Sequence, residues 1–218
     1  PTFYLRMAET IGKLQPHEIR ACLEEPSLPP PQAYEDIEPV RRRVLEETDF
    51  VGKIVLDIGG YDGFAAKIAL DNGAARAVCL DNHQYEAYGW EGKKLDGVEY
   101  IQSNFMDGDW SADIVIFYNV LYHLKNPWAA LDLIRSKHPQ EMLLCTLFRY
   151  HDGAWAYLYD EYDCNPEDTS VFWGVSLKAI ERLLTFTGWT YKQEGWAADR
   201  VVYRCWPTLE PQWRHSQW

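Results

Sequence analysis

The sequence of 218 residues lacks the cysteine pattern of a disulfide scaffold or a zinc knuckle. Its five cysteines are odd in number, scattered and without a Cys-x-x-Cys pair, so no metal site is expected. It also lacks an apolar stretch near the roughly 20 residues that cross a bilayer, and its start lacks the charged-then-apolar order of a signal peptide. These absences lead us to expect no membrane partner and a reducing, cytoplasmic location.

Basic side chains are also scarce. Lysine and arginine total 21 against 33 aspartates and glutamates, which gives a net charge of −12. Nucleic-acid binding normally depends on basic side chains that displace counterions from phosphates, so a nucleic-acid partner is not expected. The one dense basic run, Arg41-Arg42-Arg43, is interpreted as the solvated face of a helix.

Apolar residues make up 47% of the sequence, and aromatic residues 15%, which is enough to close one core and line a pocket. The length fits a single α/β domain, which we place at residues 36–206. Residues 1–35 are predicted to form an irregular N-terminal cap, because Pro29-Pro30-Pro31 favours an extended connector. Residues 207–218 show no periodicity and are predicted to be a tail.

Within the domain, short apolar runs alternate with helical patterns, an order typical of a parallel sheet covered on both faces. The runs that read as strands span residues 54–58, 77–80, 98–101, 114–117 and 142–147. The helical patterns span residues 35–47, a segment carrying Ala65, Ile68 and Ala69, a segment from Pro127, and residues 176–186. Residues 189–194 and 200–206 predict a closing hairpin. The expected fold is therefore a doubly wound α/β fold, with a mostly parallel, seven-stranded, Rossmann-like sheet and an antiparallel closing strand.

The stretch from Phe148 to Trp173 interrupts this alternation and is rich in tyrosine, tryptophan and aspartate. It is too long for an ordinary connection, and long insertions over the ligand edge of a sheet are often lids. We therefore predict an aromatic lid at residues 148–173. Its rings either cover an acceptor molecule or pack the insertion against the sheet. The side chains proposed for the acceptor are Tyr150, His151, Trp155, Tyr159 and Trp173.

A glycine-rich turn follows the first predicted strand in Val-Leu-Asp-Ile-Gly-Gly-Tyr-Asp-Gly-Phe, residues 55–64. Such a turn lets the backbone approach a ligand closely and directs free N–H groups at it. A dinucleotide site would need further glycines at the positions of Tyr61 and Phe64, and a phosphate-binding loop would need Gly-Lys-Ser/Thr after the turn. Both patterns are missing, which disfavours these two kinds of nucleotide site.

The pattern Asp-x-Gly-x-x-Asp-Gly at Asp57–Gly63 resembles motif I of class I methyltransferases. This resemblance implies S-adenosyl-L-methionine as the cofactor, with Asp57 directed at the methionine amino group. Asp81 ends the next apolar strand, where a carboxylate can accept hydrogen bonds from the ribose hydroxyls. Asn104 and Phe105, after the third strand, match the place where such enzymes hold adenine. The complete set expected to contact the cofactor is Asp57, Gly59, Gly60, Tyr61, Asp62, Gly63, Phe64, Asp81, Asn82, Asn104, Phe105, Tyr118 and Asn119.

A second resemblance covers residues 112–131 and includes Leu-Tyr-His-Leu-Lys-Asn-Pro. This segment is similar to the fourth-strand segment of methyltransferases related to the bacterial tRNA wobble-uridine carboxymethyltransferase. With residues 173–189, the likeness extends over roughly residues 50–206. It implies that Tyr118 and Asn119 border the transferred methyl group and that His123, one turn on, faces the acceptor. Tyr118 and His123 are therefore the catalytic candidates, and Tyr122 is a further candidate for acceptor contact. His123 either accepts a proton from the acceptor or only stabilises its own turn.

Three functions remain open at this point. The leading hypothesis is an enzyme that transfers a methyl group from S-adenosylmethionine to a small-molecule acceptor, aromatic or hydroxylated. A second hypothesis is carboxymethyl transfer from carboxy-S-adenosylmethionine to tRNA, which the acidic composition disfavours. A third is a cofactor-binding subunit without catalytic activity, which contacts another protein. The sequence determines neither the acceptor nor the oligomeric state.

Overall fold

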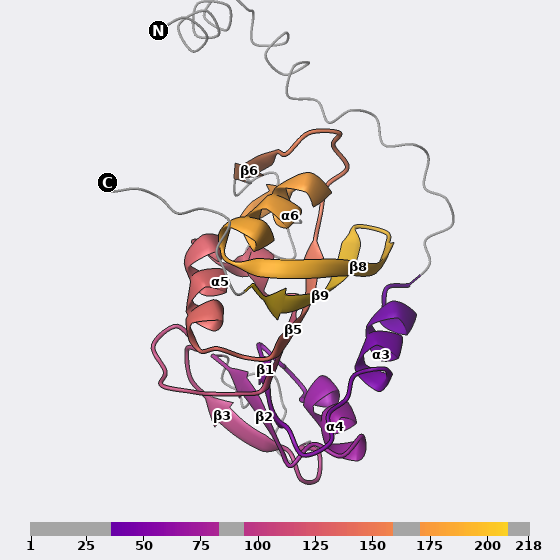
Figure 1. The fold of residues 1–218 in the computed structure, drawn as a ribbon, viewed down its shortest axis with the longest axis vertical. Coiled ribbons are helices and arrows are strands. Elements are labelled where there is room, and N and C mark those ends of the chain that lie inside the picture. The colour runs from indigo at the N-terminus through magenta and orange to yellow at the C-terminus, as the bar shows by residue number, and fades with distance from the viewer. Residues whose placement is uncertain (1–35, 83–93, 159–170, 209–218) are drawn as a thin grey trace, which may run out of the picture. The chain divides into compact units, whose positions relative to one another are not determined.

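The computed structural model describes residues 36–82, 94–158 and 171–208, and these ranges contain one seven-stranded sheet (Figure 1). The strand order is β3-β2-β1-β4-β5-β9-β8. All neighbouring pairs from β3 to β5 are parallel, whereas β9 runs antiparallel to both β5 and β8. The strands are β1 Ile54–Ile58, β2 Arg76–Asp81, β3 Glu99–Gln102, β4 Ile114–Tyr118, β5 Glu141–Leu147, β8 Trp189–Ala197 and β9 Arg200–Pro207.

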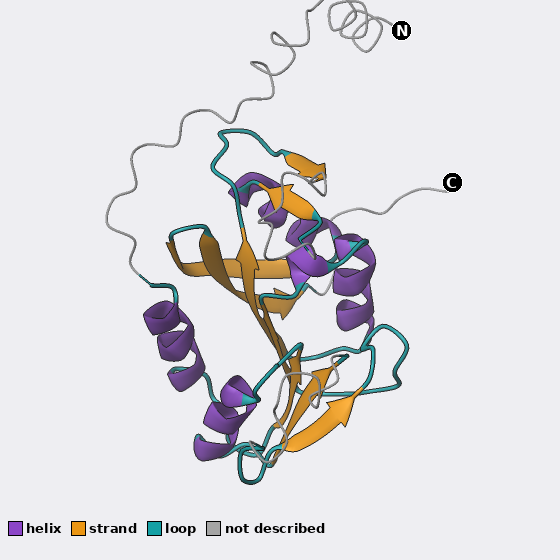
Figure 2. Ribbon diagram, turned by 180° about the vertical axis from the view of Figure 1, so that it is seen from behind, coloured by secondary structure: helices purple, strands orange, loops and turns teal. Residues whose placement is uncertain are grey.

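Helices cover both faces of this sheet (Figure 2). The helices are α3 Glu38–Glu46, α4 Phe64–Asp71, α5 Pro127–Ser136 and α6 Leu177–Phe186, with the short 3₁₀ helix η2 at Leu121–His123. Alternate residues of the strands belong to two buried clusters. One cluster contains the apolar side chains of α3 and α4, and the other contains those of α5 and α6. Because successive strand residues point to opposite faces, the central strands β4 and β5 are apolar almost throughout and serve both layers, whereas the edge strands β3 and β8 are largely exposed.

Local sequence signals explain where the helices begin. The Asn126 side chain accepts a hydrogen bond from the Ala129 N–H, and Pro127 occupies the first turn of α5. The Ser176 side chain accepts one from the Ala179 N–H and caps α6 in the same way. At the start of α4, Gly63 adopts a left-handed conformation with φ 75°, which turns the chain directly from β1 into the helix.

The predicted doubly wound, mostly parallel seven-stranded sheet is confirmed, with small corrections to its elements. The closing hairpin is longer than the sequence predicted, and its register shifts between Gln193 and Gly195. The sequence also missed a second, two-stranded sheet, in which β6, Ala156–Leu158, pairs antiparallel with β7, Trp173–Val175. These strands are too short to show the alternation by which strands are recognised in a sequence.

Several predicted parts lie outside the described residues. These are the N-terminal cap at residues 1–35, Tyr159 with most of the lid, and the tail after Thr208. The lid and the domain boundaries therefore stay predictions. In the three ranges that are described, no helix is both long and apolar enough to cross a membrane.

Candidate functional site

One cavity of about 730 Å³ opens where the carboxyl ends of β1, β2, β3 and β4 meet. Ligands of doubly wound sheets bind at this edge, near the point where the strand order reverses between β1 and β4. The volume lies within the range of small-molecule and cofactor sites. The cavity is lined by Glu38, Arg41, Leu45, Asp57, Ile58, Gly59, Gly60, Tyr61, Asp62, Phe64, Ala65, Leu80, Asp81, Asn82, Ser103, Asn104, Phe105, Tyr118, Asn119, Val120, Tyr122, His123 and Leu124.

Asp57 is a buried carboxyl near the end of β1. Its Oδ2 accepts a hydrogen bond of 3.3 Å from the backbone N–H of Ala66, in the first turn of α4. Burial raises the pKa of Asp57 from 3.8 to about 7, although the Ala66 N–H and the positive charge of Arg41 both act to lower it. A Cβ atom at Gly60 would lie 2.6 Å from this carboxyl group, so the turn passes Asp57 at a distance that only glycine allows.

Asp81 is the last residue of β2 and lies beside the same turn. Its Oδ2 accepts a hydrogen bond of 3.0 Å from the backbone N–H of Tyr61. The turn is also tied to β2 through the Gly59 N–H, which donates to the carbonyl of Leu80 at 2.7 Å. Asp57 and Asp81 thus bond to the beginning of α4 and to the turn before it, and both line the cavity.

Two residues other than glycine have positive φ in the wall of this cavity. They are Tyr61, with φ 48°, and Asn119, with φ 60°. Such conformations are sparsely populated and cluster at functional sites. The Tyr61 side chain is 52% exposed although it lies in the middle of the turn. The turn therefore lines the cavity with a half-exposed tyrosine in a conformation that few residues other than glycine adopt.

The loop after β3 contributes the wall opposite α4. The Asn104 side chain accepts a hydrogen bond from the Met106 N–H and donates one to Asp107, so its amide mainly shapes this loop. Phe105 is buried and packs edge-to-face on Phe117 at 5.7 Å between ring centroids. Both residues, together with the exposed Asn82, line the cavity at positions predicted for the adenosine part of the cofactor.

Aromatic side chains form the far wall, after β4. Tyr118 is buried, and burial raises the pKa of its phenol above the usual range, so its hydroxyl group stays protonated. The rings of Tyr122 and His123 lie 4.1 Å apart. Arg200 lies over the Tyr122 ring at 5.0 Å and donates a hydrogen bond to its hydroxyl at 3.4 Å.

The residues around β7 hold this aromatic wall in place. The Phe172 N–H donates to the carbonyl of Tyr122, and the Trp173 indole N–H donates to the carbonyl of Leu124, each at 2.9 Å. The end of the predicted lid segment therefore supports the wall through backbone carbonyls.

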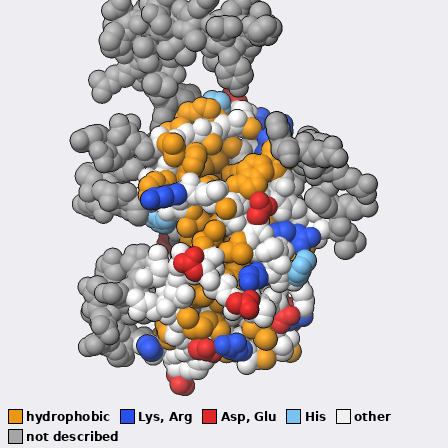
Figure 3. Space-filling model, turned by 90° about the vertical axis from the view of Figure 1, so that its left-hand side faces the viewer, with side chains coloured by type: hydrophobic (Ala, Val, Ile, Leu, Met, Phe, Trp, Pro, Cys, Tyr) orange, Lys and Arg blue, Asp and Glu red, His pale blue; other side chains and the backbone are white. Residues whose placement is uncertain are grey.

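Among the described residues of that segment, none of the side chains predicted for the acceptor lines this cavity. Trp155 and Trp173 line a second hollow, of about 320 Å³, whose walls come mainly from α5, α6, β6 and β7. Figure 3 shows apolar side chains gathered over the side of the molecule where α5 lies. Tyr150 and His151 line neither hollow, and His151 stacks on Trp155 at 5.2 Å.

Sequence reasoning missed the contribution of α3 to the cavity. Glu38, Arg41 and Leu45 line it from one side of this helix. The interpretation of Arg41-Arg42-Arg43 as a solvated face holds for Arg42 and Arg43, which pair with half-exposed glutamates, but is wrong for Arg41. The signal was present, because Arg41 falls four residues after Ile37 and three before Val44, on the apolar stripe of the helix.

Twelve of the thirteen side chains and glycines predicted to contact the cofactor line the cavity, and Gly63 stands just behind it as the cap of α4. Tyr122 and His123, predicted for the acceptor and for catalysis, line it as well. Among the described residues, no group of three or more histidine, cysteine, aspartate or glutamate side chains is arranged to hold a metal ion.

Comparison with known proteins agrees with this geometry. A family model described as "Methyltransferase domain" matches residues 32–194, whereas no curated protein matches the chain. A Haloferax volcanii protein, solved in complex with the Trm112 methyltransferase activator and called a putative methyltransferase, has a TM-score of 0.63 at 14% identity. That match covers 80% of this chain and 92% of the other.

Two further similar structures contain S-adenosylhomocysteine. The DhpI complex has a TM-score of 0.58 at 17% identity and covers 94% of this chain and 93% of that chain. The 1,6-didemethyltoxoflavin-N1-methyltransferase of Burkholderia thailandensis, solved with its acceptor, has a TM-score of 0.58 at 14% identity and covers 88% and 83% of the two chains. At these identities the likeness shows the fold. The family model, however, spans well over half of the sequence, and the chain therefore belongs to the methyltransferase-domain family.

Proposed function

We propose that this chain transfers the methyl group of S-adenosyl-L-methionine to a small-molecule acceptor. The observation that carries the proposal is the placement of Asp57 and Asp81 at two neighbouring strand ends, both bonded beside one glycine-rich turn and both lining one cavity. Methyltransferases solved with S-adenosylhomocysteine share the fold, and one of them acts on a small heterocyclic acceptor according to its name.

The two carboxylates would hold opposite parts of the cofactor. Asp81 accepts a hydrogen bond from the Tyr61 N–H, and a carboxylate can accept several hydrogen bonds at once, which suits it to the ribose hydroxyls. Asp57 suits the methionine ammonium, because a positive charge beside it would offset the burial that raises its pKa. Asn82 and Phe105 would then border the adenosine part, and Gly59 and Gly60 would allow its close approach.

The cofactor supplies an activated methyl group, so the protein has mainly to align and desolvate the reaction. The acceptor atom forms a bond to the methyl carbon while the carbon–sulfur bond breaks, its electron pair stays on sulfur, and the acceptor loses a proton. Tyr118 and Asn119, at the end of β4, would border the methyl group. We assign acceptance of the proton to His123, since the protonated phenol of Tyr118 cannot serve as a base.

The composition and the cavity both favour a small acceptor. The net charge of −12 opposes binding of a polyanion such as tRNA. The wall at and after the end of β4 includes the aromatic rings of Tyr118, Tyr122 and His123, which suit a flat or hydroxylated molecule. These observations do not support an assignment to the branch related to the tRNA wobble-uridine carboxymethyltransferase.

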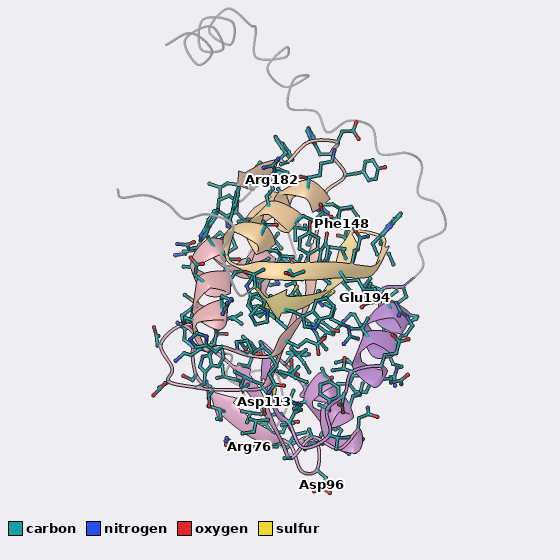
Figure 4. All side chains as sticks on the ribbon, in the orientation of Figure 1. Arg76, Asp96, Asp113, Phe148, Arg182 and Glu194 are labelled. Carbon is teal, nitrogen blue, oxygen red and sulfur yellow. The ribbon has the colours of Figure 1, made fainter. Side chains whose placement is uncertain are left out.

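Binding of S-adenosylhomocysteine to the purified chain, measured by isothermal titration calorimetry, tests the proposal. The parent should bind in the micromolar range, and Asp81→Ala should weaken binding by roughly a hundredfold, because two ribose hydroxyls lose a charged acceptor. Asp96→Ala is the matched control, since it removes an exposed carboxylate on the loop before β3 (Figure 4). A parent that does not bind, or an Asp81→Ala variant that binds as tightly as the control, would refute the proposed site.

A further inference from the structure

Arg41 is a cation on the wall of the cavity, and one of its hydrogen-bond donors has no acceptor in the described part of the chain. It lies on α3 and lines the cavity, and its guanidinium group lies 5.0 Å from the centroid of the Tyr118 ring. One terminal nitrogen contacts Glu38 at 3.0 Å. Its Nε is buried and has no acceptor among the described residues. A buried donor without an acceptor is costly, which points to a partner that binds there.

The neighbouring arginines share this arrangement only in part, since Arg42 lies over the ring of Phe64 at 4.9 Å but, within the described ranges, neither of them has a buried donor without an acceptor. Arg42 pairs with Glu46, and Arg43 pairs with Glu47 and donates to the carbonyl of Glu194. Neither residue lines the cavity. The special position of Arg41 therefore comes from its place on the buried stripe of α3, and not from a general accumulation of positive charge.

Arg41 also lies close to Asp57 without bonding to it. Its charge acts to lower the pKa of Asp57, and no ion pair is found between these two described residues. A carboxyl group and a guanidinium cation thus face the same space. The carboxyl group can accept a further hydrogen bond, and the guanidinium group can donate one. A molecule that carries an ammonium and a carboxylate group on one carbon atom matches this pair, with the ammonium at Asp57 and the carboxylate at Arg41.

We propose that Arg41 binds the α-carboxylate of the methionine part of the cofactor, an inference that rests on the proposed function. Arginine binds carboxylates through paired N–H donors, and the buried Nε can provide one of them. Glu38 and the Tyr118 ring hold the guanidinium group in place. Arg41 is then a specificity-determining residue, which favours an adenosyl amino acid over the corresponding decarboxylated molecule.

The test uses two ligands that differ only in this group. They are S-adenosylhomocysteine and decarboxylated S-adenosylhomocysteine, which keeps the adenosine, the thioether and the primary amine. The parent should bind the first roughly tenfold to a hundredfold more tightly. Arg41→Leu should remove that preference by weakening S-adenosylhomocysteine alone, and Arg41→Lys should restore part of it because the charge is kept. Arg43→Leu removes an equal charge from the same helix at a position that bonds to Glu47 and Glu194, away from the cavity, and should bind both ligands as the parent does.

The possible failures are distinguishable. If the parent binds neither ligand, the proposed function fails and this inference fails with it. If the parent binds both ligands equally, or Arg41→Leu weakens both alike, the cofactor site stands and the role of Arg41 is refuted. A selective loss of carboxy-S-adenosylmethionine in Arg41→Leu, with S-adenosylhomocysteine unaffected, would also overturn the inference, because the arginine would then serve a carboxymethyl donor.

Discussion

Arg41 and Arg204 lie in two regions of the molecule where a cation is surrounded by acids, and they differ in how fully they are bonded. Arg204, on β9, is 12% exposed and donates to Glu141, Glu194, the Thr48 hydroxyl and the carbonyl of Val44. Its Nε and both terminal nitrogens all have acceptors. Arg41 has one carboxylate partner and a buried Nε without an acceptor. A saturated guanidinium group stabilises the fold, whereas an unsaturated one beside a cavity is available to a ligand.

The acids in the two regions differ in the same way. Glu194 lies on β8 of the closing hairpin, next to α3 (Figure 4), with a side chain that is only 4% exposed. Burial acts to raise its pKa, but its bonds to Lys192 and Arg204 outweigh burial and the pKa is lowered. In Asp57 burial prevails, and the pKa rises to about 7. The buried acid that lacks a bonded cation is the one that lines the cavity.

The largest expected effect comes from breaking the saturated region. Arg204→Met should lower the free energy of unfolding by about 3–5 kcal/mol, because it leaves two carboxylates without their buried partner. Urea denaturation measures the loss. S-adenosylhomocysteine affinity of the folded variant should stay unchanged, since Arg204 does not line the cavity. A loss of affinity without a loss of stability would reverse the distinction drawn between the two arginines.

The Asp57→Asn substitution should have the second largest effect on stability. Unlike Arg204→Met, it should make the protein more stable than the parent at pH 8. The pKa of Asp57 in the folded state, about 7, lies above the ordinary value of 3.8. As the pH rises, the carboxyl group therefore stays protonated to a higher pH in the folded state than in the unfolded chain. Parent stability should therefore fall as pH rises between about 4 and about 7, by up to about 4 kcal/mol at roughly 1.4 kcal/mol per pH unit. The amide stays neutral and can still accept from the Ala66 N–H, so the variant should lack this loss.

Urea denaturation of parent and Asp57→Asn at pH 5 and pH 8, without ligand, checks this expectation. The variant should be the more stable protein at pH 8 and should bind S-adenosylhomocysteine more weakly. If the difference between the two proteins does not change with pH, the carboxyl group is not held in its neutral form by burial.

The smallest effect should follow from an exposed pair. Arg76 bonds to both oxygens of Glu99 at 2.8 and 2.9 Å, but their side chains are 50% and 46% exposed (Figure 4). Arg76→Met should cost at most about 1 kcal/mol, because solvent screens exposed charges. Urea denaturation in low and high salt should show this small cost disappear as salt is added. A cost as large as that of Arg204→Met would mean that saturation and burial do not decide the contribution of an arginine here.

The sheet, and the side of the cavity next to it, could be predicted from the amino-acid pattern. Apolar runs that alternate with helical periods leave few arrangements other than a doubly wound parallel sheet, and the residues just after each run must then meet at one edge. This is why Asp57 and Asp81 could be expected at one edge of the sheet from the order of the strands, whereas Asn119 was placed there through the resemblance of its segment to methyltransferases. Backbone chemistry contributed as well, because a glycine-rich turn between a buried strand and a helix permits close approach of a ligand.

The other elements that reach that edge became known from the packed fold. The period of α3 marks a buried stripe but does not say what it packs against, so the position of Arg41 over Tyr118 could not be foreseen. Likewise, the composition around Trp155 and Trp173 predicted an aromatic cover, yet pairing of β6 with β7 directs both rings to a separate hollow. Local patterns follow from bonds between near neighbours, whereas these contacts join segments far apart in the chain and depend on the whole packed fold.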